Sequence, residues 1–131
     1  MSNAASSAKP GVAAPRQRVL CVDDDPVSLA LVREILLRAG WEVECASNAA
    51  IARQLPHVLD FDAITTDHEM PDLDGLSFVA SVRCAGFKGR VVVVSASAGP
   101  AEQKVYRALH VSAILGKPVS ASELLAALQG P

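Results

Sequence analysis

Apolar residues in this chain occur in short continuous runs, separated by longer segments in which they recur at helical spacing. The run at residues 91–94 consists of valine alone, which is typical of a strand buried on both faces. Between the first two runs, Leu31, Val32, Ile35 and Leu36 fall on one face of a helix. This alternation predicts an α/β fold with a single doubly wound parallel sheet and helices on both faces.

The pattern predicts five strands alternating with five helices, without an internal repeat or a second domain. Right-handed crossover connections restrict such a chain to a few topologies. The strands are expected at residues 18–23, 41–46, 61–66, 90–95 and 111–115. The helices are expected at residues 26–39, 48–55, 75–84, 100–109 and 120–129.

Residues suited to helix ends support these boundaries. Asp25 is a candidate N-cap, with Pro26 at the first helical position. Gly40 is suited to the position that follows the last turn of the same helix. Ser47 and Asp74 are the candidate caps of the second and third helices.

Composition predicts an aliphatic core, because half of the residues are apolar and only 4% are aromatic. The fourth helix is accordingly predicted to turn Val105, Ala108 and Leu109 toward the sheet. The net charge of -2 gives no electrostatic reason to bind nucleic acid. No apolar stretch approaches the roughly 20 residues of a membrane span, so no membrane contact is expected.

The cysteines and the N-terminus bear on the setting of the protein. Three scattered residues, Cys21, Cys45 and Cys84, argue against a disulfide framework or a zinc site. We expect small buried thiols in a reducing cytoplasm, the first two on neighbouring strands. Residues 1–16 are predicted to be an expression-tag remnant and a flexible tail or linker, which favours a folded domain at 17–131 cut from a longer protein.

Two acidic clusters follow predicted strands. Asp23, Asp24 and Asp25 follow the first strand, and Asp67 follows the third. Because ligands bind at the carboxyl ends of the strands in open parallel sheets, we expect both clusters at one edge of the sheet. Like charges gathered there need a cation or a proton. The sequence therefore predicts a divalent-metal site with one carboxylate left over.

The chemistry of the carboxylates assigns their roles. A hard cation such as Mg²⁺ takes oxygen ligands, keeps several waters and uses one or two carboxylates. Asp24 is the predicted direct ligand, Asp23 is predicted to act mostly through water, and the backbone carbonyl of Glu69 is expected to add an oxygen. Asp67, ionised beside the cation, can attack phosphorus and form an aspartyl-phosphate.

Two further polar residues are expected at the same edge. Lys117 follows the fifth strand, where its ammonium can pair with a phosphoryl oxygen. Ser95 ends the fourth strand, where its hydroxyl can bond a second phosphoryl oxygen. Either residue alone would be uninformative, and the shared edge is what favours a joint role.

These motifs resemble those of the response-regulator receiver domains of two-component signalling. They lie in the family's order and spacing at Val22-Asp23-Asp24-Asp25-Pro26, Asp67-x-x-Met70-Pro71-x-x-Asp74-Gly75, Ser95-Ala96 and Lys117-Pro118. The resemblance covers residues 17–130 and implies the flavodoxin-like strand order 2-1-3-4-5.

The resemblance also implies the function. Asp67 is the implied phosphoacceptor, Ser95 the switch hydroxyl and Lys117 the phosphate-binding lysine. The implied metal ligands are Asp23, Asp24, Asp67 and the Glu69 carbonyl, with Mg²⁺ as the ion and Mn²⁺ as a substitute. The implied donor is a histidine kinase or histidine phosphotransfer protein, and the implied output is binding of a downstream protein. Such a domain is not an enzyme beyond its own phosphorylation and dephosphorylation. Homodimerisation stays open.

Three positions depart from the family pattern or invite a specific role. Ile114 stands where the family usually has Tyr or Phe, and we interpret it as core filling without aromatic gating. His68, on the loop, is expected to face solvent or a partner. Glu69 is hypothesised to alter the lifetime of the phosphorylated state.

Two alternatives accompany this interpretation. A receiver-shaped binding module would be regulated without phosphorylation, by its partner alone. A small phosphohydrolase would also use an aspartate nucleophile, but such enzymes usually carry Asp-x-Asp on the first strand and a cap over the substrate. Here the acidic run is continuous and 131 residues leave no room for a cap.

Overall fold

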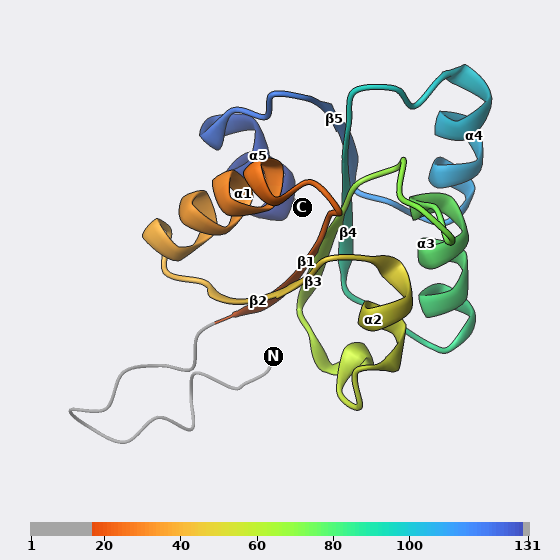
Figure 1. Ribbon diagram of the computed structural model, residues 1–131, viewed down its shortest axis with the longest axis horizontal. Coiled ribbons are helices and arrows are strands. Elements are labelled where there is room, and N and C mark those ends of the chain that lie inside the picture. Colours follow the sequence, from red (N-terminus) through yellow and green to blue (C-terminus); the bar gives the residue numbers. More distant parts are fainter. Residues whose placement is uncertain (1–16, 130–131) are drawn as a thin grey trace.

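A computed structural model describes residues 17–129 of the chain. Its centre is one parallel sheet in the order β2-β1-β3-β4-β5, as the sequence predicted. Figure 1 shows the strands side by side with helices on both faces. The strands are β1 (Arg18–Val22), β2 (Glu42–Ala46), β3 (Ala63–Thr66), β4 (Arg90–Ser95) and β5 (Ala113–Gly116).

Five α-helices connect the strands and divide between the two faces of the sheet. In Figure 1, α1 and α5 lie together on one face, and α2, α3 and α4 lie on the other. A short 3-10 helix that the pattern did not predict, η2 (Val58–Asp60), precedes β3. The α-helices are α1 (Pro26–Arg38), α2 (Ala49–Gln54), α3 (Gly75–Cys84), α4 (Pro100–Ala108) and α5 (Ala121–Gln129).

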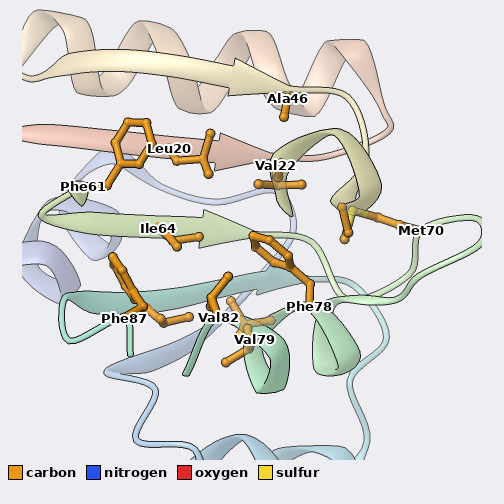
Figure 2. Packing of buried hydrophobic residues seen from close by; sticks show 14 of the residues in the cluster. Leu20, Val22, Ala46, Phe61, Ile64, Met70, Phe78, Val79, Val82 and Phe87 are labelled. Atoms are coloured by element: carbon orange, nitrogen blue, oxygen red, sulfur yellow. The ribbon is translucent and has the colours of Figure 1, made fainter. Parts of the chain in front are cut away.

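The sheet separates two apolar cores, because successive side chains of a strand point to opposite faces. Leu20 and Ile64 pack toward α2 and α3, a cluster that Figure 2 shows in close-up. Val19 and Val92 pack toward α1 and α5. Because both faces are covered, the central strands are mostly apolar, and β3 is buried along its whole length although it ends in Thr65 and Thr66.

The helix caps are mostly as predicted. The side chain of Asp25 accepts a hydrogen bond from the Val27 N–H, and Asp74 caps α3 in the same manner. The prediction for α2 was wrong by one residue: Asn48, and not Ser47, accepts from the Ile51 N–H.

The predicted inner face of α4 was also wrong. Val105 is 45% exposed and Ala108 is exposed, whereas Tyr106 is completely buried and is the buried side chain of this helix. Leu109, just past the helix, packs partly against the core as expected. The actual inner face is set by the three-residue spacing of Tyr106 and Leu109, with the tyrosine at its centre.

The thiols are only partly as predicted. Cys21 and Cys45 are register partners on β1 and β2, which confirms their placement on neighbouring strands. Cys21 is buried, but Cys45 and Cys84 are exposed, which contradicts three buried thiols. Cys45 is exposed because β2 is an edge strand that the helices cover incompletely. Among residues 17–129, no helix combines the length and apolarity that crossing a membrane requires.

Candidate functional site

The site lies at the carboxyl edge of the sheet, where four neighbouring strands end. Asp23 follows β1 and Asp67 follows β3, and these strands pair in register up to Val22 and Thr66. Ser95 is the last residue of β4, and Lys117 follows β5. The strand order therefore brings together side chains that are up to ninety-four positions apart in sequence.

Lys117 bridges the two buried carboxylates. Its Nζ lies 3.0 Å from Asp23 Oδ2 and 3.4 Å from Asp67 Oδ2. Asp23 is 6% exposed and Asp67 is 8% exposed, so water solvates neither carboxylate well. One ammonium therefore faces two carboxylates in a poorly solvated space, which favours binding of a further cation.

The pKa values of these groups reflect the shortage of positive charge. Burial, and then the neighbouring charge of Asp23, raises the pKa of the Asp67 carboxyl, and Lys117 only partly opposes the rise. For Lys117, burial disfavours the charged form, but the hydrogen bond and charge of Asp23, with the charge of Asp67, leave the pKa above its ordinary value. The lysine therefore stays an ammonium, and an additional cation nearby would stabilise the ionised form of Asp67.

The donor set fits a hard divalent cation. Oxygen atoms of Asp23, Asp24 and Asp67 all lie within 4.8 Å of one another. Asp24 is exposed, so a metal bound by it can keep water ligands, as Mg²⁺ prefers. The side chain of Glu69 is exposed on the loop after β3 and lines a cleft of about 430 Å³. The residues lining this cleft are Asp24, His68, Glu69, Met70, Pro71 and Asp74.

The loop after β3 is held tightly against the start of α3. The N–H of His68 donates to Asp67 Oδ1 at 2.8 Å, and the His68 carbonyl accepts from the Gly75 N–H at 2.8 Å. A Cβ on Gly75 would collide with the Asp67 carbonyl oxygen, so glycine is required there. Asp72 adopts φ 70° within this loop. The Asp67 carboxylate is thus set on a short, closely packed loop.

Ser95 and Ile114 lie beside this cluster. Ser95 is 6% exposed, and its Oγ accepts a hydrogen bond from the Ser97 N–H at 3.0 Å. Its hydroxyl proton is therefore available to another acceptor at the same edge. Ile114 is partly buried against the core on the α3 side, a position that fits the packing role assigned to it.

Two residues form a contact that the sequence did not reveal. The hydroxyl of Tyr106 lies 2.6 Å from Nδ1 of His68, with the rings edge to face at a centroid distance of 5.5 Å. The expectation that His68 faces only solvent or a partner was wrong, because its ring is half-buried against α4. The three-residue spacing of Tyr106 and Leu109 was the sequence feature that could have placed Tyr106 on the inner face of α4.

The chain has close relatives among known proteins. It matches the family described as the response regulator receiver domain over residues 19–129. It is 40% identical over 97 residues to protein-glutamate methylesterase/protein-glutamine glutaminase 1 of Anaeromyxobacter dehalogenans, which covers 74% of this chain and 28% of that protein. It is 30% identical over 112 residues to sensory/regulatory protein RpfC of Xanthomonas campestris pv. campestris, covering 82% and 15%. The chain thus spans less than a third of these relatives.

Two solved structures agree with the fold. The response regulator receiver protein from Pseudomonas putida matches with a TM-score of 0.80 at 28% identity, covering 91% of this chain and 100% of that one. The chemotaxis protein CheY4 of Vibrio cholerae matches with a TM-score of 0.75 at 29% identity, covering 88% and 98%. The whole described domain therefore corresponds to a complete folded unit in other proteins.

Proposed function

Because this chain belongs to the response regulator receiver domain family of two-component signalling, we propose that Asp67 is the residue that accepts the phosphoryl group. The observation that supports this assignment is the position of Asp67, buried at the centre of the edge between Asp23 and Lys117. It shares the lysine with Asp23 and is one of the three carboxylates of the metal-type donor set.

The proposed reaction is an in-line transfer. A carboxylate oxygen of Asp67 forms a bond to phosphorus while the bond from phosphorus to the donor's imidazole nitrogen breaks, and the imidazole leaves with its electron pair. Asp23, Asp24, Asp67 and the Glu69 carbonyl would hold Mg²⁺, which supplies positive charge against the phosphoryl oxygens when it is bound. Mn²⁺ has the same ligand preferences and would serve as a substitute.

Lys117 and Ser95 would stabilise the phosphorylated form of Asp67. Lys117 already lies 3.4 Å from Asp67 Oδ2, so a small movement lets its ammonium donate to a phosphoryl oxygen. Ser95 would turn its hydroxyl toward a second phosphoryl oxygen, since within residues 17–129 its Oγ accepts from the Ser97 N–H and donates to no side chain or carbonyl. The phosphoryl group carries a charge of about -1.5 to -2; the Lys117 ammonium offsets part of this charge, and Ser95 contributes a hydrogen bond.

The partners follow from this reaction. The donor is a phosphohistidine on a histidine kinase or a histidine phosphotransfer protein, and the output is binding of a downstream protein to the rearranged surface. The domain turns over no external substrate, functions in the cytoplasm and is one part of a longer hybrid kinase or regulator. We propose residues 17–131 as the receiver domain; positions 130–131 and the proposed tail at 1–16 lie outside the described residues.

Intact mass after incubation with acetyl phosphate tests the proposal directly. We expect the parent protein to gain one phosphoryl group when Mg²⁺ is present and to gain none when the metal is chelated. Asp67→Asn is expected to gain none, whereas Asp72→Asn, on the same loop, should behave as the parent does. A parent that gains nothing, and whose spectra also fail to respond to beryllofluoride, would instead favour a module regulated by its partner alone.

Glu69 is proposed to set how long the phosphoryl group persists. Its exposed carboxylate lines the cleft two residues from Asp67, where it is placed to influence an approaching water. Glu69→Asn should change the dephosphorylation half-life, followed by the decay of the mass shift, relative to Asp72→Asn as control. An unchanged half-life in Glu69→Asn would refute this role.

A further inference from the structure

Helix α4 is attached to the rest of the domain through very few groups. Tyr106 is its buried side chain, whereas the neighbouring Val105 and Ala108 are exposed. In Figure 1, α4 lies at the outside of the layer, beside α3 and away from β2. A helix held in this way can be moved by a change at one contact, because little other apolar surface resists the movement.

The contact made by Tyr106 is polar at its tip. Its ring is fully buried in the core on the α3 side, and its hydroxyl reaches Nδ1 of His68 at 2.6 Å. Burial raises the pKa of Tyr106, so the phenol keeps its proton at physiological pH. A protonated phenol donates to the imidazole nitrogen, and the two rings also meet edge to face.

His68 connects this hydroxyl directly to the acceptor. Its backbone N–H donates to Asp67 Oδ1, and its carbonyl is fixed by the Gly75 N–H at the start of α3. The Tyr106 hydroxyl also lies against Gly75, at 2.8 Å from where a Cβ would stand. Any reorientation of the Asp67 carboxylate therefore acts on the same residue that holds the tyrosine.

The C-terminal end of α4 is held by a separate set of hydrogen bonds. Arg83, on α3, donates from Nε to the Leu109 carbonyl at 2.9 Å and from Nη2 to the His110 carbonyl at 3.0 Å. These bonds fix the chain just after the last turn of α4. Displacement of Tyr106 would therefore turn the helix about its C-terminal end, with the largest movement at its N-terminal end.

We propose that the Tyr106–His68 hydrogen bond is the link through which phosphorylation of Asp67 repositions α4. The proposal rests on the proposed function. Once phosphorus is bonded to a carboxylate oxygen, the acceptor of the His68 N–H changes in charge and direction, and the loop adjusts to it. The imidazole then no longer meets the phenol at its original position. Tyr106 is thus a positioning residue that acts through His68.

The single tyrosine of the chain allows a direct test by ¹⁹F NMR. Protein labelled with 3-fluorotyrosine should give one resonance, which we expect to shift on phosphorylation by acetyl phosphate with Mg²⁺. In His68→Ala the phosphorylation-dependent shift should shrink severalfold or vanish. His57→Ala is the matched control, because that histidine pairs with Glu44, outside the site, and should leave the shift intact.

Tyr106→Phe provides a second readout, because it keeps the ring in the core and removes only the hydroxyl. Phosphorylation should alter the hydrogen exchange of α4 amides in the parent, and this response should fall about two- to tenfold in Tyr106→Phe, in proportion to one lost hydrogen bond. A merely structural hydroxyl would change α4 exchange equally with and without phosphorylation.

Mass spectra of the same samples separate the possible failures. If the parent protein gains no phosphoryl group, both the proposed function and this inference are refuted. A parent that gains the group without a ¹⁹F shift, or an equal shift in His68→Ala, overturns the inference alone. An α4 response that is as large in Tyr106→Phe as in the parent also overturns it.

Discussion

The two ends of the sheet both hold charged side chains that are at least partly buried, but the groups around these charges differ. At the amino ends of β4 and β5, the Arg83 guanidinium donates to four backbone carbonyls at 2.8–3.0 Å. At the carboxyl ends, Lys117 is shared by Asp23 and Asp67. The four carbonyls belong to Leu109, Phe87, Gly89 and His110.

The difference separates a site whose polar groups are satisfied from one that is short of positive charge. The carbonyls around Arg83 carry only partial charges, and the single cation satisfies them without creating repulsion. Burial lowers the pKa of Arg83, yet a guanidinium still remains charged. Around Lys117, in contrast, the pKa of Asp67 is raised, which means that its ionised form is held at a cost in stability. The first arrangement stabilises the fold, and the second favours binding of a further cation.

The largest expected effect is at the amino end. Arg83→Met leaves four carbonyls without their donor and should lower the free energy of unfolding by about 3 kcal/mol. Thermal unfolding followed by circular dichroism measures this loss. Arg38→Met is the matched control, because Arg38 pairs with Glu34 on the exposed surface of α1, and it should leave stability nearly unchanged. Equal losses in the two variants would contradict a structural role for Arg83.

A smaller effect is expected at the carboxyl end. Lys117→Met leaves Asp23 and Asp67 buried without a cation and should lower stability by about 2 kcal/mol in chelator. Added Mg²⁺ should restore part of the loss, because it supplies the missing charge. The exposed Lys104, changed to Met, should be neutral in both conditions. A loss in Lys117→Met that Mg²⁺ leaves unchanged would contradict the shared-cation description.

The smallest effect should have the opposite sign. The pKa of Asp67 is raised in the folded state, so its protonated form adds stability below the ordinary value near 4. That contribution is lost as the pH rises through the raised pKa, and the ionised form is destabilising above it. Asp67→Asn should therefore be more stable than the parent at pH 7 without metal, by about 1 kcal/mol.

Denaturant unfolding at several pH values measures this difference. It should disappear as the pH falls below the ordinary carboxyl value, where the parent is protonated. Mg²⁺ should also reduce it, because metal stabilises the parent more than the variant. Asp72→Asn, on the exposed part of the loop, should show neither change. A destabilised Asp67→Asn at neutral pH would contradict the account of the site.

The sequence was sufficient to predict the layout of the carboxyl edge. Continuous apolar strands define a parallel sheet, so polar residues at strand ends converge on one edge, as Asp23, Asp67 and Lys117 do. The family resemblance inferred from their spacing is confirmed by the match over residues 19–129. The chemical roles of these residues stay predictions.

The sequence was not sufficient where a contact depends on tertiary structure. Hydropathy favours Val105 over Tyr106 as a core residue, because a phenol must find a partner before it is buried. That partner, His68, is thirty-eight positions away and lies on a loop whose course no local pattern encodes. Ser47 and Asn48 are equally good caps by type, and only the backbone conformation at the start of α2 selects the second.

The exposed outer side of α4 has a consequence for how such a domain can diversify. Val105 and Ala108 contribute little to the core, so substitutions there change what another protein meets without changing interior volume. The reactive edge and the Arg83 anchor use other residues altogether. Under the proposed function, the surface that α4 offers to a partner can therefore change over generations while the residues of the carboxyl edge are inherited unchanged.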